Sequence, residues 1–198
     1  MTDAPLSETL AGFRWSEEPA AWSLGRELEL TTRPDTDYWQ RTHYGFRRDN
    51  GHFFFTAAAG DFSLTARLQF QPVAQYDQCG VMCRVDQDSW IKASVEYEPH
   101  GLSRLGSVVT NRGYSDWATQ DIDASVAQMW YRLSRRGSDF HIESSADGQR
   151  WQQMRITHLH DCPAEIQVGV YACSPVGPGF ACRVSDVALG PSQWGAHE

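Results

Sequence analysis

Three polar side chains at alternate positions of one segment are the best placed to do chemistry. Lys92, Ser94 and Glu96 lie in residues 90–98. Successive side chains of a strand point to opposite faces, so an ammonium group, a hydroxyl and a carboxylate would share one face. The opposite face would carry the apolar row Ile91, Ala93, Val95 and Tyr97. A central strand with such a polar row opens either onto a ligand-binding cleft or onto solvent, and both interpretations stand.

Polar residues also precede this segment. Tyr76, Asp77 and Gln78 lead into an apolar run at residues 80–85 that is typical of a strand. Loop residues at the ends of strands are common binding positions, so all three are candidates for contact with a ligand. The alternative is that Asp77 and Gln78 simply form the turn that enters the strand.

Amide, carboxylate and aromatic side chains follow the same segment. Asn111, Asp116 and Trp117 combine hydrogen-bonding groups with a ring face. Sugar sites use this combination, because rings stack on the apolar faces of a sugar while amides and carboxylates bind its hydroxyl groups. The structural alternative is that Asp116 caps a turn and Trp117 closes one end of the fold.

A fourth segment, residues 37–44, places Trp39, Arg41 and His43 on one face if it is extended. Neither of its faces is purely apolar, so we expect a strand that lines a cleft or an edge. The candidate ligand-binding residues of the four segments are Trp39, Arg41, Tyr76, Asp77, Gln78, Lys92, Ser94, Glu96, Asn111, Asp116 and Trp117.

Catalysis and metal binding have weaker support. Glu96 and Glu98 form a close carboxylate pair on one face of a predicted strand, and a glycoside hydrolase needs two carboxyl groups. Glu98 precedes Pro99, which places it at the strand end in solvent. His158 and His160 could share a strand face and ligate a metal, but a third ligand is not evident. We therefore name no catalytic residue, metal ligand or cofactor.

Composition limits the class of protein. The 198 residues are 41% hydrophobic and 21% charged, which is typical of a globular chain. A net charge of −8 without any Lys/Arg run argues against nucleic acid as a partner. No apolar segment reaches the ~20 residues of a membrane span, and no signal peptide is visible. Together with the odd number of cysteines, 5, this predicts a cytoplasmic protein without disulfides or a membrane partner.

Alternation with a period of two dominates the chain and predicts strands. A short turn of helix could form at residues 6–11 and at residues 121–130. The absence of repeats and linkers favours one domain over residues 1–198, an all-β sandwich or barrel. The predicted strands are residues 27–32, 52–57, 63–70, 80–85, 90–98, 105–110, 130–135, 140–145, 165–172 and 181–189.

Together these segments resemble a family of uncharacterised domains that includes the "regulation of enolase" protein, in the concanavalin A-like lectin/glucanase superfamily. The resemblance covers a core of about residues 13–189. It is carried by Asp37-Tyr38-Trp39-Gln40-Arg41-Thr42, Tyr76-Asp77-Gln78-Cys79-Gly80-Val81-Met82, Trp90-Ile91-Lys92 with Glu96, Val108-Val109-Thr110, Ser115-Asp116-Trp117, Ser145-Ala146-Asp147-Gly148 and Cys173-Ser174-Pro175.

This resemblance implies a jelly-roll sandwich of two antiparallel sheets whose concave sheet holds the ligand. The row Lys92, Ser94 and Glu96 would face that groove. We therefore expect a non-catalytic domain that binds a carbohydrate or another small polar ligand. Two alternatives remain, a glycoside hydrolase that uses carboxylates such as Glu96 and a regulatory domain that binds a partner protein. An exposed sheet edge could also join two copies into a homodimer.

Overall fold

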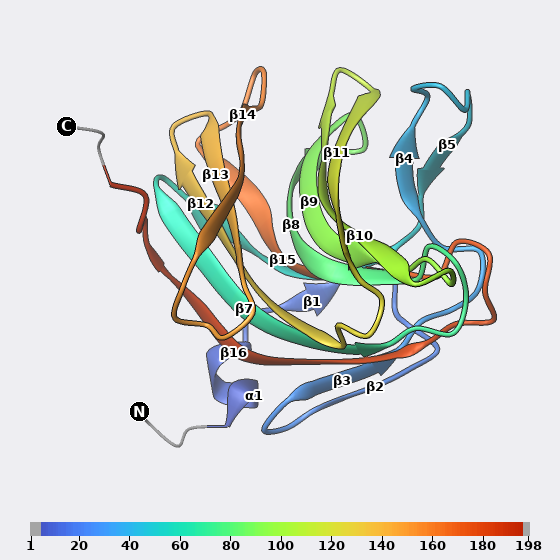
Figure 1. The fold of residues 1–198 in the computed structure, drawn as a ribbon. Helices are drawn as coiled ribbons and strands as arrows, with labels where there is room; N and C mark the ends of the chain where they lie inside the picture. The colour runs from blue at the N-terminus through green and yellow to red at the C-terminus, as the bar shows by residue number, and fades with distance from the viewer. Residues whose placement is uncertain (1–4, 196–198) are drawn as a thin grey trace.

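Two antiparallel sheets of seven strands each form the molecule, and a short hairpin lies against one of them (Figure 1). The computed structural model describes residues 5–195. The elements in chain order are α1 (Leu6–Thr9), β1 (Arg14–Trp15), β2 (Ala21–Leu24), β3 (Leu28–Thr31), β4 (Tyr38–Gln40), β5 (Arg47–Asp49), β6 (His52–Ala59), β7 (Phe62–Gln71), β8 (Gln78–Asp86), β9 (Ser89–Glu96), β10 (Leu102–Asn111), β11 (Tyr114–Asp123), β12 (Gln128–Arg136), β13 (Asp139–Ser145), β14 (Gln152–His158), β15 (Glu165–Cys173) and β16 (Ala181–Pro191).

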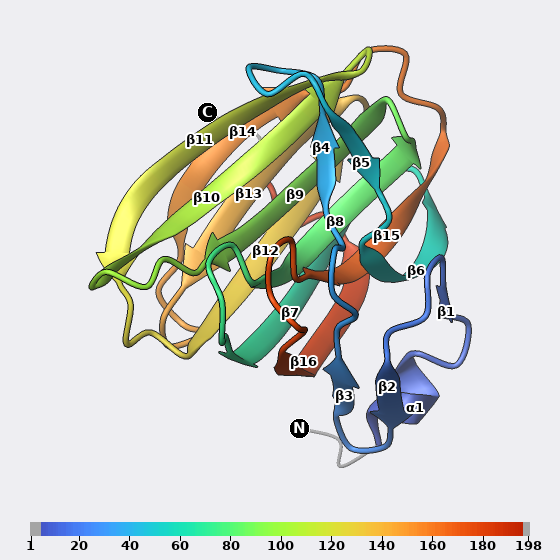
Figure 2. The same ribbon diagram turned by 90° about the vertical axis from the view of Figure 1, so that its right-hand side faces the viewer.

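Sheet I has the strand order β1-β6-β15-β8-β9-β10-β11, and sheet II has the order β14-β13-β12-β7-β16-β3-β2. The hairpin β4–β5 stands on the face of sheet I that is turned away from sheet II (Figure 1). Figure 2 shows the hairpin crossing in front of β8 and β9. The expected all-β sandwich of two antiparallel sheets is therefore confirmed.

The main core lies between the two sheets and is built from alternate residues of each strand. On β9 the apolar row Ile91, Ala93 and Val95 is buried there, as the alternation predicts. Leu64 and Leu68 of β7 belong to the same core and are fully buried. Tyr97, which was expected to extend the apolar row, lies beyond the end of β9 at Glu96.

A second, smaller core lies on the opposite face of sheet I, beneath the hairpin. Its buried members are Tyr38, Trp39, Phe53, Phe55, Met82, Trp90, Val108, Tyr171 and Cys173. Trp90 shares the polar face of β9 but is 0% exposed, because the hairpin covers it. This face of sheet I is therefore neither a solvated exterior nor a simple open groove.

All ten predicted strands are present, and two local predictions are wrong. The expected helical turn at residues 121–130 is replaced by the end of β11, a turn, and the start of β12. The expected extended run at residues 37–44 ends at Gln40, because Arg41 and His43 adopt left-handed backbone angles of φ 57° and 63°. Those angles turn the chain back into the hairpin.

The short helix at the N-terminal side is present as α1 and contributes Leu6 to the main core. Within residues 5–195, no helix is both long and apolar enough to span a bilayer. All five cysteines are free thiols, and four of them are buried. Cys79 and Cys83 of β8 both pack in the main core, which agrees with the expectation that they are not bridged.

Candidate ligand-binding site

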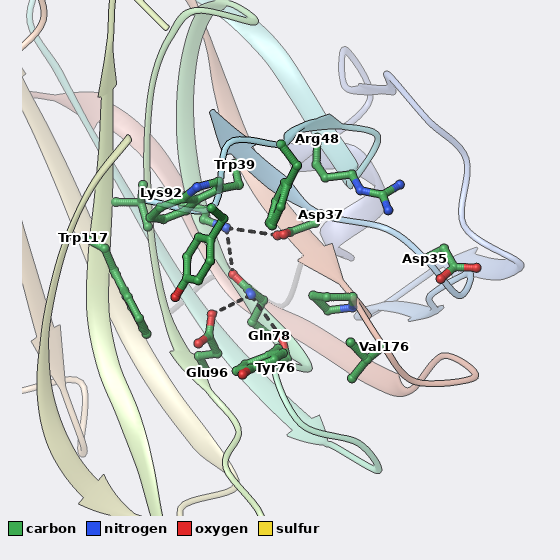
Figure 3. Close-up of a pocket in the computed structure, with 14 residues that line it drawn as sticks. Asp35, Asp37, Trp39, Arg48, Tyr76, Gln78, Lys92, Glu96, Trp117 and Val176 are labelled. Carbon is green, nitrogen blue, oxygen red and sulfur yellow. Dashed lines mark hydrogen bonds and ion pairs between the residues drawn. The ribbon is translucent and has the colours of Figure 1, made fainter. Parts of the chain in front are cut away.

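A cavity of ≈ 340 Å³ opens between the hairpin and the outer face of sheet I (Figure 3). It falls in the size range of small-molecule sites, about 300–1,000 Å³. Sheet strands β8 to β11 supply its floor, while the hairpin and three loops supply its walls. The lining residues are Asp35, Asp37, Trp39, Tyr44, Phe46, Arg48, Tyr76, Gln78, Lys92, Glu96, Val108, Trp117, Pro175 and Val176.

Lys92 lies at the bottom of the cavity and is the only lysine in the chain. Its side chain is 4% exposed, and its Nζ lies 3.6 Å from Oδ1 of Asp37. The same Nζ donates to the carbonyl of Tyr38 at 3.0 Å and to Oε1 of Gln78 at 2.9 Å. A buried ammonium is tolerated only when its donors and charge are satisfied, and these three contacts do so. Lys92 thereby fixes β4 to β9.

Gln78 is the residue that connects the other polar groups of the floor. Its Oε1 accepts from Lys92 and from the hydroxyl of Tyr171 at 3.0 Å, and its Nε2 donates to Oε2 of Glu96 at 2.8 Å. Because an ammonium can only donate, the amide oxygen must point toward Lys92 and the amide nitrogen toward Glu96. The second partner of Tyr171 is Oγ of Ser94, at 2.8 Å.

Glu96 stands at the end of β9 with one side open to the cavity. Its surroundings raise the pKa of the carboxyl group from 4.5 to about 7, chiefly because burial penalises the charged form, while nearby Lys92 pulls the other way. Asp37 and Glu98 add repulsion in the same direction as burial. Glu96 is therefore a carboxyl group that changes charge near neutral pH.

Tyr76 reaches the cavity wall from a strained position at the entrance to β8. Its φ is 70°, a left-handed value that is uncommon for a bulky side chain. The Tyr76 N–H donates to the Tyr97 carbonyl at 2.8 Å, and its own carbonyl accepts from Nε2 of Gln78 at 3.1 Å. These bonds hold the ring at the cavity despite the unfavourable backbone angle.

Asp77 supports the walls from below and is 2% exposed. Its Oδ2 accepts from the N–H groups of Val73 and Ala74, each at 2.9 Å, and its Oδ1 accepts from Oγ of Ser174 at 2.6 Å. The carboxylate thus ties the loop before β8 to the loop after β15, which carries Pro175 and Val176 into the wall.

The hairpin is attached to sheet I by side chains at both of its strands. Arg84 of β8 forms a two-point ion pair with Asp49 of β5, at 2.6 and 2.8 Å. Oγ of Ser115 on β11 accepts from the N–H of Gln40 at 2.9 Å. Paired arginine and carboxylate groups with parallel bonds fix orientation as well as distance. The hairpin and the sheet therefore form one site.

The predicted site residues divide into four groups. Six of the eleven line the cavity: Trp39, Tyr76, Gln78, Lys92, Glu96 and Trp117. Ser94 lines a small adjoining recess that it shares with Glu96 and Trp117. Asp77 lies beneath the wall, while Arg41, Asn111 and Asp116 point elsewhere.

The three outlying residues each have a structural partner. The Arg41 guanidinium lies over the ring of Tyr114, 5.3 Å from its centre. Asn111 donates to the His158 carbonyl at 2.9 Å and ties the end of β10 to the end of β14. Asp116 pairs with Arg155 at 2.8 Å, because neighbouring residues of β11 face opposite sides and Trp117 takes the cavity side.

Neither the carboxylate pair nor the histidine pair forms the predicted arrangement. Glu98 lies beyond β9 and accepts from Nε2 of Gln75 at 2.7 Å, outside the cavity that Glu96 lines. His158 ends β14, and His160 lies in the following turn, so the two rings meet edge to face at 5.1 Å. Among residues 5–195, no group of three or more His, Cys, Asp or Glu side chains could hold a metal ion.

The sequence predicts the residues of the cavity floor better than those of its walls. The unpredicted lining residues are Asp35, Asp37, Tyr44, Phe46, Arg48, Val108, Pro175 and Val176. Most come from the hairpin and from loops, where alternation gives no information about direction. One available signal was the single lysine, because a lone ammonium in the middle of an apolar strand needs carboxylate and carbonyl partners nearby.

One family model matches most of the chain, including every residue that lines the cavity. The family model described as "Protein of unknown function (DUF1349)" matches residues 15–192. The chain belongs to the DUF1349 family. It is 32% identical over 189 residues to "Regulation of enolase protein 1" of Saccharomyces cerevisiae, covering 96% of this chain and 94% of that protein.

Solved structures extend the DUF1349 comparison to the fold. A functionally unknown protein from Saccharomyces cerevisiae has a TM-score of 0.87 at 30% identity, covering 94% of this chain and 99% of that one. A GH43 protein from Bacillus licheniformis has a TM-score of 0.71 at 17% identity over 37% of its own length. The alginate lyase from Klebsiella pneumoniae has a TM-score of 0.63 at 10% identity, over 93% of this chain and 96% of its own. The last two similarities concern the sandwich fold.

Proposed function

We propose that this DUF1349 protein is a non-catalytic binding domain that holds a carbohydrate or another small polar ligand in the cavity under the hairpin. The observation that carries the proposal is the pairing of a polar floor with an aromatic rim. Among the large hydrophobic side chains that are exposed, five line this one cavity: Tyr44, Phe46, Tyr76, Trp117 and Val176. Exposed apolar groups that gather around polar ones mark binding sites.

The rim and floor suit a ligand with both polar and apolar faces. Trp117 is 39% exposed and stands beside Glu96 at the cavity wall (Figure 3). A ring of this kind stacks on the apolar face of a sugar, while the free side of the Glu96 carboxyl group accepts from a hydroxyl. Hydrolysis has less support, because Glu98, the expected partner of Glu96, lies outside the cavity. The free thiols support the proposed cytoplasmic location.

The test is a binding screen in which two tryptophan variants are compared. We expect wild-type protein to bind members of an immobilised glycan and small-metabolite panel, and Trp117→Ala to lose that binding at least about tenfold. Trp22→Ala is the matched control, because Trp22 on β2 has a similar exposure, 42% against 39%, and lies outside the cavity.

Three results would speak against the proposal. Binding that both variants retain would place the ligand elsewhere. Turnover of any panel member by the wild type would favour the hydrolase alternative. Failure of every small ligand, with capture of one defined protein that Trp117→Ala abolishes, would favour the partner-binding alternative.

A further inference from the structure

We propose that the ligand of this cavity carries a positively charged ammonium group, which the carboxyl group of Glu96 and the aromatic rim receive together. This inference rests on the proposed binding function and narrows it to one chemical class, small polar molecules that contain an amine or a quaternary ammonium group.

The first argument is the charge that the cavity leaves unpaired. Its lining contains three carboxyl groups and two cationic groups: Asp35, Asp37 and Glu96 against Arg48 and Lys92. The ammonium group of Lys92 contacts Asp37, Gln78 and the Tyr38 carbonyl, and its side chain is buried at the bottom of the cavity. Two of its three donors are used in hydrogen bonds, and the ion pair with Asp37 offsets its charge, so this buried group is poorly placed to bind an anionic ligand.

Arg48 does not restore the balance. In Figure 3 its guanidinium points away from Glu96 and Trp117, and Asp35 also lies at the far end of the cavity, so Glu96 is the charge that remains beside the rings. Glu96 receives one bond, from Gln78 to its Oε2, and its Oε1 has no hydrogen-bond partner among the described residues. A carboxylate oxygen that faces a cavity without a partner is complementary to a donor, and most strongly to a charged one.

The second argument is the ring content of the same cavity. Five aromatic side chains line it: Trp39, Tyr44, Phe46, Tyr76 and Trp117. Tyr44 connects two of the others, with ring centres 5.5 Å from Trp39 and 5.6 Å from Phe46. The face of an aromatic ring attracts a cation, especially where water is excluded.

Among the described residues, no Lys or Arg head group lies over any of these five rings. The described Lys and Arg head groups that lie over rings use other ones, as with Lys92 over Trp90 and Tyr171 at 5.7 and 5.5 Å. The aromatic rim and the open carboxylate oxygen therefore both favour a cation in the cavity, on independent grounds. A net charge of −8 for the chain adds a long-range attraction for cations.

The ionisation of Glu96 agrees with this geometry. Burial raises the pKa of its carboxyl group to about 7 in the unliganded protein. A cation beside Oε1 would favour the charged form and lower that pKa again. Binding of a permanent cation should consequently release a proton near neutral pH and strengthen as the pH rises through about 7.

The experiment compares two probes of the same shape that differ in charge. Choline and 3,3-dimethylbutan-1-ol are titrated into the full chain, and binding is followed through the tryptophan indole N–H signal that disappears in Trp117→Ala. At pH 8 we expect choline to bind at least about tenfold more tightly than the neutral alcohol. We expect Glu96→Gln to remove most of that difference and the pH dependence with it.

Glu98→Gln is the control, because that carboxyl group is two residues away and outside the cavity. The inference is overturned if choline binds no better than the neutral alcohol, or if Glu96→Gln leaves the preference intact. A third result is that neutral glycans bind through Trp117 while choline is not preferred over the neutral alcohol. That result would support the proposed binding function but overturn the inference that the ligand carries an ammonium group. The absence of any Trp117-dependent ligand would remove both.

Discussion

The amide nitrogen of Gln78 lies 2.8 Å from Oε2 of Glu96, while the amide oxygen of the same side chain accepts from the buried Lys92 at 2.9 Å. Gln78 thus separates a cation from a carboxylate that would otherwise pair directly. The cation stays neutralised by Asp37 at 3.6 Å, and Glu96 keeps one face for the cavity. The arrangement leaves the carboxyl group of Glu96 poorly compensated, which gives it a measurable titration.

Glu96→Gln should change how stability depends on pH. The folded pKa of Glu96 lies near 7, above the ordinary 4.5, so the folded state holds this proton more tightly than the unfolded state. Its ionisation therefore lowers stability progressively as the pH rises from about 4.5 to about 7. At pH 8 we expect the variant to exceed the wild type by about 1–2 kcal/mol, after discounting for the open side of the group, and to match it at pH 4.5.

Urea denaturation at the two pH values measures this difference. Glu98→Gln should retain most of the wild-type pH dependence, because Glu98 raises the pKa of Glu96 less than burial does. Curves for Glu96→Gln and wild type that stay parallel from pH 4.5 to pH 8 would show that Glu96 is not the group that titrates.

Lys92 should resist chemical modification in the folded protein. Its side chain is 4% exposed, and its ammonium group contacts Asp37, Gln78 and Tyr38. Acylation requires a free, accessible amine, so a short pulse of an amine-specific acetylating reagent should leave Lys92 unmodified in buffer and modify it fully in urea. Because no other lysine exists, a peptide map reads the result from one site. Rapid acetylation under native conditions would mean that the floor opens to solvent.

Arg84→Ala should weaken ligand binding from outside the cavity. The two-point ion pair with Asp49 fixes β5, and the hairpin carries Trp39, Tyr44 and Phe46 to the cavity. We expect the unfolding free energy to fall by about 1–2 kcal/mol. Because the cavity walls become mobile, we expect ligand affinity to fall by a larger fraction of its wild-type value than the unfolding free energy does. Arg183→Ala is the matched control, because its ion pair with Glu29 is about half exposed and lies on sheet II. Equal affinities for the two variants would contradict this role.

Gly80→Ala should destabilise sheet I by more than about 2 kcal/mol. A Cβ atom added at Gly80 would collide with the backbone carbonyl of Ala93 on β9. A Cβ atom added at Gly190 on β16 would have no described atom within 4 Å, so Gly190→Ala should change stability by less than about 0.5 kcal/mol. Thermal denaturation of both variants makes the comparison. A Gly80→Ala protein with an unchanged melting temperature would show that β8 and β9 are less tightly apposed than described.

The sequence predicts the floor of the site well, because a strand has only two faces. Once Ile91, Ala93 and Val95 are assigned to the core, Lys92 and Glu96 must share the opposite face. What alternation cannot show is whether that face is covered. The cover comes from the hairpin β4–β5, which pairs with neither sheet through its backbone.

The remaining errors come from local backbone geometry, from strand register and from weak apolar alternation. Arg41 was expected on a strand face, but its φ of 57° begins the tip of the hairpin and turns the side chain toward Tyr114. Asp116 was expected beside the ligand, but the register of β11 gives the cavity side to Trp117. Strand β11 itself was missed because its exposed residues carry little apolar alternation. Backbone geometry at the hairpin tip, the register of β11 and the weak alternation of its residues account for these cases in turn.

The separate attachment of the hairpin to sheet I has an evolutionary consequence. Within the described chain, strands β4 and β5 form a backbone ladder only with each other, and side chains such as Lys92, Arg84 and Ser115 secure them to sheet I. Substitutions or length changes at the hairpin tip, between Arg41 and Phe46, would reshape one wall of the cavity without disturbing the ladder of either sheet. The shape of the cavity is therefore free to diverge among related chains while the sandwich itself stays the same.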